Sequence, residues 1–119
     1  MRGDQERVLD ILEAIGKIMS RRGGRFEAFA ADEMLLVWAV YHFQIIGEAA
    51  ARVSEKMRQS HPEVPWADMV AMRNVLVHHY FGIDAREVWA TIEKDLPALE
   101  RLLQGLTRGK EAPEEGEER

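Results

Sequence analysis

The 119-residue sequence has no cysteine, which excludes disulfide bonds and thiolate metal sites within the chain. Serine occurs three times, never in the glycine-flanked turn that presents a hydrolase nucleophile. No apolar run reaches the roughly 18 residues that span a bilayer, since the longest, residues 34–46, contains His42 and Gln44. That run is typical of a buried core helix. The N-terminal residues are charged instead of apolar, so we expect no secretory signal, no membrane association and a cytoplasmic protein.

Positive charge is also scarce. The net charge is −5, and the C-terminal residues 109–119 contribute −3 of it. An acidic body argues against the broad basic surface of a protein that coats nucleic acid, but it is compatible with a site that holds a few phosphates. Because residues 109–119 mix glutamates with glycine and proline, they are expected to form a solvated, disordered tail. The predicted organisation is one helical domain over residues 1–108, followed by this tail.

Strand patterns are absent, whereas helical periodicity is strong. We expect four main helices, over residues 4–22, 26–57, 65–77 and 85–106. Asp4 is the expected N-cap of the first, and Asp84 with Glu87 forms the capping box of the last, which Pro97 should bend. The sequence therefore predicts an all-α, up-and-down bundle of four main helices.

The second expected helix carries a continuous apolar stripe, formed by Leu35, Trp38, Tyr41, Ile45, Ala49, Val53 and Met57. The small residues of GEAAA, at 47–51, should let another helix approach closely. Within that motif, Glu48 is either a buried interface acid or a solvated one. The three tryptophans are expected to be core or interface anchors, and His42 to be structural.

Polar groups gather in residues 72–80, MRNVLVHHY, which include the only asparagine of the chain. Arg73 offers a forked cation that suits phosphate oxygens. His78 can take or give a proton near neutral pH. Together they suffice for RNA cleavage in which a base activates the ribose 2′-hydroxyl and a cation stabilises the transition state. His78 and the adjacent His79 point about 100° apart on a helix, so we expect no metal site and no cofactor.

The spacing leaves alternatives open. On an ideal helix Arg73 and His78 lie about 140° apart around the axis and about 7.5 Å apart along it. They would meet only if the helix unwinds near His78, or if a two-fold dimer combines two chains. The imidazoles could instead simply suit the negative end of the helix dipole. Arg73 could likewise pair with Asp68 or with an acid on another helix.

Five motifs occur in one order: DEMLL at 32–36, IIGEAA at 45–50, HPEVPW at 61–66, MRNVLVHHYFGID at 72–84 and DLPAL at 95–99. As a set they resemble the HepT-like toxins of the HEPN superfamily, over about residues 5–105. The resemblance implies a helical homodimer with a metal-independent endoribonuclease site at its interface. Its signature arginine and histidine fall on Arg73 and His78, and its supporting polar residue falls on Asn74. His79 is a second imidazole, but the signature spacing selects His78.

The resemblance also implies the toxin of a type VII-like toxin–antitoxin pair. Its antitoxin would be a nucleotidyltransferase that moves AMP from ATP to the signature tyrosine, which is Tyr80. An anionic group beside Arg73 would oppose RNA phosphate there. The alternative is a non-catalytic substrate- or nucleotide-binding subunit that partners a minimal nucleotidyltransferase.

Overall fold

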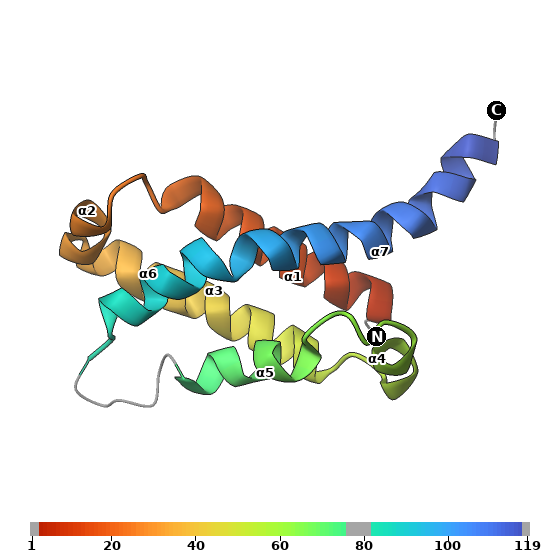
Figure 1. Ribbon diagram of the computed structural model, residues 1–119, viewed down its shortest axis with the longest axis horizontal. Helices are drawn as coiled ribbons and strands as arrows, with labels where there is room; N and C mark the ends of the chain where they lie inside the picture. Colours follow the sequence, from red (N-terminus) through yellow and green to blue (C-terminus); the bar gives the residue numbers. More distant parts are fainter. Residues whose placement is uncertain (1–2, 76–81, 118–119) are drawn as a thin grey trace.

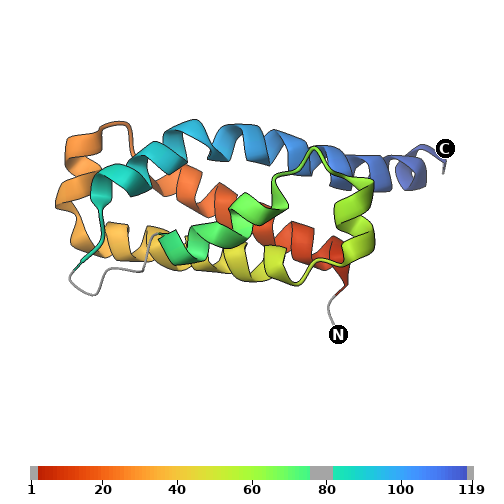
Figure 2. The same cartoon turned by 60° about the horizontal axis from the view of Figure 1, so that its bottom comes forward.

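A computed structural model describes residues 3–75 and 82–117 of the chain, without the side chains of residues 74–75 and 108–117. These ranges hold seven α-helices and no strand: α1 (Asp4–Arg21), α2 (Phe26–Ala31), α3 (Glu33–Ala51), α4 (Glu55–Ser60), α5 (Trp66–Val75), α6 (Ala85–Lys94) and α7 (Leu96–Glu117). Helices α6 and α7 follow one another along one side of the molecule, and α1, α3 and α5 run beside them (Figures 1 and 2). The all-α fold class expected from the sequence is confirmed.

The single helix expected over residues 26–57 is wrong, because that stretch forms α2, α3 and α4. Asp32 ends α2 and begins α3, where its carboxylate accepts a hydrogen bond from the Leu35 N–H at 3.0 Å. Ser54 begins α4 in the same way, accepting from the Met57 N–H at 3.1 Å. Short polar side chains satisfy the free N–H groups of a first turn, and this competes with continuing the preceding helix.

The last expected helix is also divided, at Asp95, into α6 and α7. Pro97 stands in the first turn of α7, where its missing N–H loses no helical hydrogen bond, so the interruption expected at Pro97 is a break between two helices, two residues earlier. Asp84 is confirmed as the N-cap of α6, since it accepts from the N–H groups of Arg86 and Glu87. Helix α7 continues to Glu117, through most of the expected tail.

The expected N-cap of α1, Asp4, is wrong by one residue. Gly3 occupies that position, and its N–H donates to the Glu6 carboxylate at 2.5 Å. Asp4 instead accepts from the N–H and the hydroxyl of Ser54, at 2.9 and 2.5 Å. The start of α1 is thereby tied to the start of α4.

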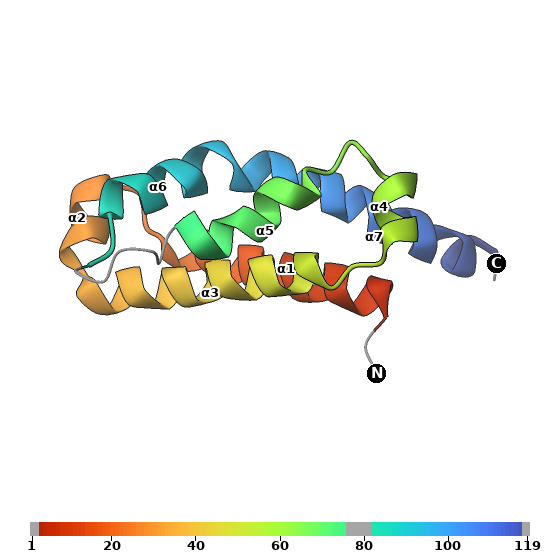
Figure 3. The ribbon, with the colours of Figure 1, turned by 90° about the horizontal axis from the view of Figure 1, so that it is seen from below.

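Helix α3 is the centre of the core and packs against both α1 and α5 (Figure 3). Its Phe43 and Ile46 are fully buried, together with Ile11 and Ile15 of α1 and Met69 of α5. By length and composition α3 is the one helix in the described ranges that could cross a membrane, and half of its most apolar window is buried inside the protein. The burial accounts for the apolar sequence of α3, since these side chains fill the core.

The C-terminal end of α3 and the start of α5 are held by side chains that bond to backbone carbonyls. Arg58 donates to the carbonyl oxygens of Ala50 and Ala51, the last residues of α3. The Trp66 indole N–H donates to the His61 carbonyl at 3.0 Å, and Trp66 is buried, which confirms it as a core anchor. These contacts hold the end of α3 and the start of α5 in place.

Candidate functional site

Arg73 lies in the last turn of α5, where the backbone of α3 comes very close. A Cβ atom added at Gly47 of α3 would stand 2.8 Å from Arg73 Cβ, 3.1 Å from Cγ and 3.2 Å from Cδ. The aliphatic stem of Arg73 therefore occupies the space that any larger residue at position 47 would fill. The expectation that GEAAA admits a close helix is confirmed, and the approaching helix is α5.

The guanidinium of Arg73 continues past Gly47 to the next residue of α3. Its Nη1 lies 3.1 Å from Glu48 Oε2, and the Arg73 and Glu48 side chains are 31% and 56% exposed. The other carboxylate oxygen, Oε1, lies 3.9 Å from Nη2 of Arg52, the residue that follows α3. Of the partners left open by the sequence, Arg73 thus takes an acid on another helix, and Glu48 is a solvated acid.

A shallow groove of about 300 Å³ between α1 and α3 adjoins this pair. Its polar lining consists of Arg7, Asp10, Tyr41, Gln44, Glu48 and Arg52. The Nε atom of Arg7 is buried and has no hydrogen-bond partner among the described residues. Arg7 and Arg52 line the groove together with Asp10 and Glu48, and Arg73 is bonded to Glu48 beside it. The guanidinium groups are the part of this surface that suits contact with a few phosphates.

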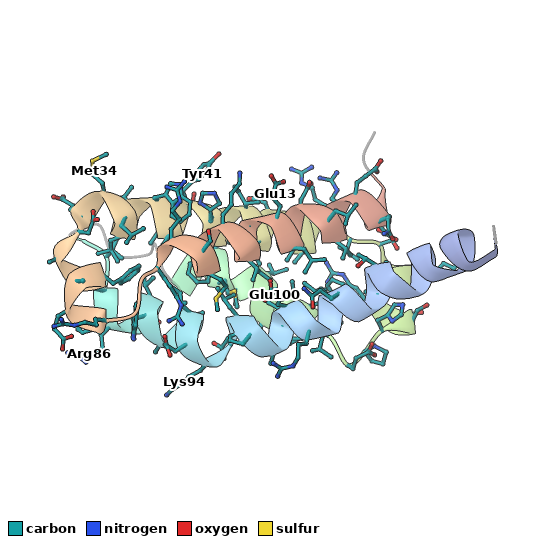
Figure 4. All side chains as sticks on the ribbon, turned by 90° about the horizontal axis from the view of Figure 1, so that it is seen from above. Glu13, Met34, Tyr41, Arg86, Lys94 and Glu100 are labelled. Atoms are coloured by element: carbon teal, nitrogen blue, oxygen red, sulfur yellow. The ribbon has the colours of Figure 1, made fainter. Side chains whose placement is uncertain are left out.

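One face of α3 exposes large apolar side chains. Met34, Val37 and Tyr41 are 82%, 53% and 58% exposed, and Met34 and Tyr41 project away from the helices (Figure 4). The spacing of three and four residues places them on one face, and Glu48, seven residues after Tyr41, continues it. We call Met34, Val37 and Tyr41 the α3 stripe. Tyr41, which the sequence placed in a continuous apolar stripe, is exposed, because the buried face of α3 is turned toward α1 and α5.

His42 is structural, as the sequence suggested. It is buried, and its Nδ1 lies 2.8 Å from the Trp38 carbonyl oxygen. Because a carbonyl only accepts hydrogen bonds, Nδ1 is the nitrogen that carries the proton in this contact. Neighbouring Trp38 and Tyr41 rings pack against the imidazole.

The structure places only part of the predicted site. Arg73 is described in full, and Asn74 follows it in α5 with its side chain outside the described part of the chain. His78 and Tyr80 lie outside the described residues, and so does His79. Their roles, and any meeting of Arg73 with His78, stay predictions. No group of three or more His, Cys, Asp or Glu residues within 3–75 and 82–117 is arranged to hold a metal ion.

Sequence reasoning expected a close helix at Gly47, but it gave Glu48 no catalytic role and related neither residue to Arg73. One signal was available, since a glycine followed by an acid sits in the middle of an otherwise apolar helix. Without the crossing of α3 and α5, nothing related that dipeptide to Arg73, which lies 26 positions further along the chain.

These features define an all-α protein whose central helix presents an apolar stripe and borders a groove lined by two arginines and two acids. Residues 11–106 match the family described as "Ribonuclease HepT-like". The chain is 35% identical over 108 residues to "Probable ribonuclease HepT" of Thermococcus cleftensis, a match that covers 90% of this chain and 98% of the relative. A "Putative RNase" of Caldanaerobacter subterraneus subsp. tengcongensis is 40% identical over 83 residues, covering 70% of this chain and 74% of the relative. No solved structure gives a significant match.

The chain therefore belongs to the HepT-like ribonuclease family. This membership confirms the resemblance read from the five motifs. It makes ribonuclease the activity of the family and RNA the implied substrate.

Proposed function

We propose that this protein is the toxin of a type VII-like toxin–antitoxin pair, acting in the cytoplasm as a homodimeric, metal-independent endoribonuclease. The observation that carries the proposal is the placement of Arg73. Its side chain is partly exposed beside the groove that Arg7 and Arg52 line, in a chain that belongs to a ribonuclease family.

The chemistry assigned to the site is transesterification. His78 removes the proton of the ribose 2′-hydroxyl, and the resulting oxyanion attacks the adjacent phosphorus. The bond from phosphorus to the 5′-oxygen breaks, and that oxygen leaves with the proton that the protonated His78 imidazole returns. Arg73 stabilises the negative charge that builds up on the phosphate oxygens, while Asn74 orients the reacting groups. The products are a 2′,3′-cyclic phosphate and a 5′-hydroxyl.

The α3 stripe supports a homodimer. Three large apolar side chains on one face of a helix are costly to leave in water, and a second copy of the chain would cover them. Glu48 lies on the same face, and Arg73 is bound to it. A dimer formed across this face would bring the Arg73 residues of both chains near its interface. Arg73 of one chain could then act with His78 of the other, although the two residues would point apart on one helix.

Cleavage in the presence of EDTA is the test of this chemistry. Purified protein should cut RNA without added metal and leave 2′,3′-cyclic phosphate ends, and Arg73→Ala and His78→Ala should each abolish the cut. Cleavage that requires added metal would reject the mechanism. No cleavage by wild-type protein, together with retained binding of a nucleotidyltransferase, would favour the non-catalytic subunit.

Neutralisation is assigned to AMP transfer onto Tyr80 by a cognate nucleotidyltransferase that uses ATP. Intact mass measured after incubation with that partner and ATP should rise by whole AMP units, and cleavage should fall in parallel. Tyr80→Phe is the matched control. A mass increase that persists in Tyr80→Phe would show that the modified residue is another one.

A further inference from the structure

Two adjacent residues of α3, Gly47 and Glu48, hold the side chain of Arg73 in different ways. Gly47 leaves the space through which the stem of Arg73 crosses the α3 backbone. Glu48 supplies a carboxylate 3.1 Å from its guanidinium. A surface ion pair by itself contributes little to stability, about 0–1 kcal/mol. The geometry is therefore better explained by what it does to the arginine than by what it adds to the fold.

We infer that Glu48 is a positioning residue of the ribonuclease site, holding the Arg73 guanidinium in the orientation that meets the scissile phosphate. The inference rests on the proposed function. An arginine has five N–H donors, and one bond to Glu48 leaves the remaining donors for phosphate oxygens. Without that bond, Arg73 is a flexible side chain 31% exposed at a helix end, free to take other rotamers.

Arg52 is the competing partner on the same carboxylate. Its Nη2 lies 3.9 Å from Glu48, against 3.1 Å for Nη1 of Arg73. Arg52 directly follows the last residue of α3, the helix that holds Glu48, whereas Arg73 is bonded from α5, so only the shorter contact joins two helices. Glu48 thus couples the site on α5 to the central helix.

The negative charge of Glu48 should also affect RNA binding, so the inference predicts opposite effects on binding and on the chemical step. A negative charge beside the place of the RNA phosphate repels the substrate and weakens its binding. Removing the charge should therefore tighten RNA binding while it slows the chemical step. A loss of folded protein would lower kcat without lowering KM, so the two explanations differ in a measurable way.

The test compares Glu48→Gln, Glu48→Asp and a control, Glu13→Gln, by steady-state RNA cleavage. Glu13 is a matched choice because it is an exposed acid with one cation partner, Lys17 at 3.5 Å on α1. Glu48→Gln should lower kcat by up to about 100-fold, because a misplacement of about 1 Å can cost that much, and should lower KM. Glu48→Asp should recover part of kcat, and Glu13→Gln should match wild type.

A double variant separates action through Arg73 from any other effect. If Glu48 acts through Arg73, then adding Glu48→Gln to Arg73→Lys should cost much less than it costs in the wild-type background. Equal losses in both backgrounds overturn the inference. It is also overturned if wild type cleaves RNA, Arg73→Ala does not, and Glu48→Gln behaves like Glu13→Gln, in which case the proposed function stands. If wild type cleaves no RNA at all, the proposed function fails and the inference fails with it.

Discussion

Replacing Gly47 by alanine is the sharpest test of the crossing between α3 and α5. The new Cβ would stand 2.8, 3.1 and 3.2 Å from three carbons of Arg73. Carbon atoms pack at about 3.5–4.0 Å, so α5 or the Arg73 side chain must move by about 1 Å. Overpacking of this kind costs about 1–3 kcal/mol. Against it stands a gain of about 0.5–1 kcal/mol, because alanine is the better helix former.

The chain offers two matched controls for this substitution. Gly16 in α1 and Gly105 in α7 are also helical, and a Cβ at either would meet nothing within 4 Å. Alanine at these positions should keep the full helix gain of about 0.5–1 kcal/mol. The free energy of unfolding of Gly47→Ala should therefore fall about 1–3 kcal/mol below that of Gly16→Ala, the overpacking cost alone.

Thermal unfolding and urea titration of the three variants measure that difference. For a domain of this size, each 1 kcal/mol corresponds to about 4 °C in Tm. Gly47→Ala should therefore melt several degrees below Gly16→Ala and Gly105→Ala. RNA cleavage by folded Gly47→Ala should also be reduced, since Arg73 is displaced. If Gly47→Ala melts at or above Gly16→Ala, the close approach of the two helices is refuted.

Three further substitutions test the interface, a cap and the core. Val37→Glu in the α3 stripe should lower cleavage and convert the proposed dimer into a monomer, as measured by light scattering. Leu9→Glu makes the same kind of change at an exposed position of α1 and should leave the mass of the dimer unchanged. Asp84→Ala removes the N-cap of α6 and should cost about 0.5–2 kcal/mol in urea unfolding, with little change in cleavage. Phe43→Ala empties a fully buried position and should cost about 3–5 kcal/mol.

The fold class was predictable because helical periodicity is a local property. Apolar residues at spacings of three and four indicated α1 correctly and α6 with the first half of α7 as one helix, and the N-cap at Asp84 follows from a short-range pattern. The division of residues 26–57 was missed, although Asp32 and Ser54 were visible in the sequence. Both residues can continue a helix or begin a new one, and neighbouring helices decide between the two.

The candidate site was also predictable only in part. Arg73 was predicted as a phosphate-binding group from its chemistry and from the signature spacing, and its partner was left open. The exposure of Tyr41 was not predicted either, because an apolar side chain suits the core and an interface equally well. Which of these it lines depends on how α3 is rotated against its neighbours.

By itself, the sequence determined the all-α class, the family and the types of residue available for chemistry, because periodicity, motif order and functional groups are properties of the chain. Only the tertiary structure decided that Gly47 and Glu48 receive Arg73 and that the α3 stripe faces outward. The physical reason is that these facts depend on the distance and rotation between two helices. That geometry is set by the packing of the whole core, and no single residue specifies it.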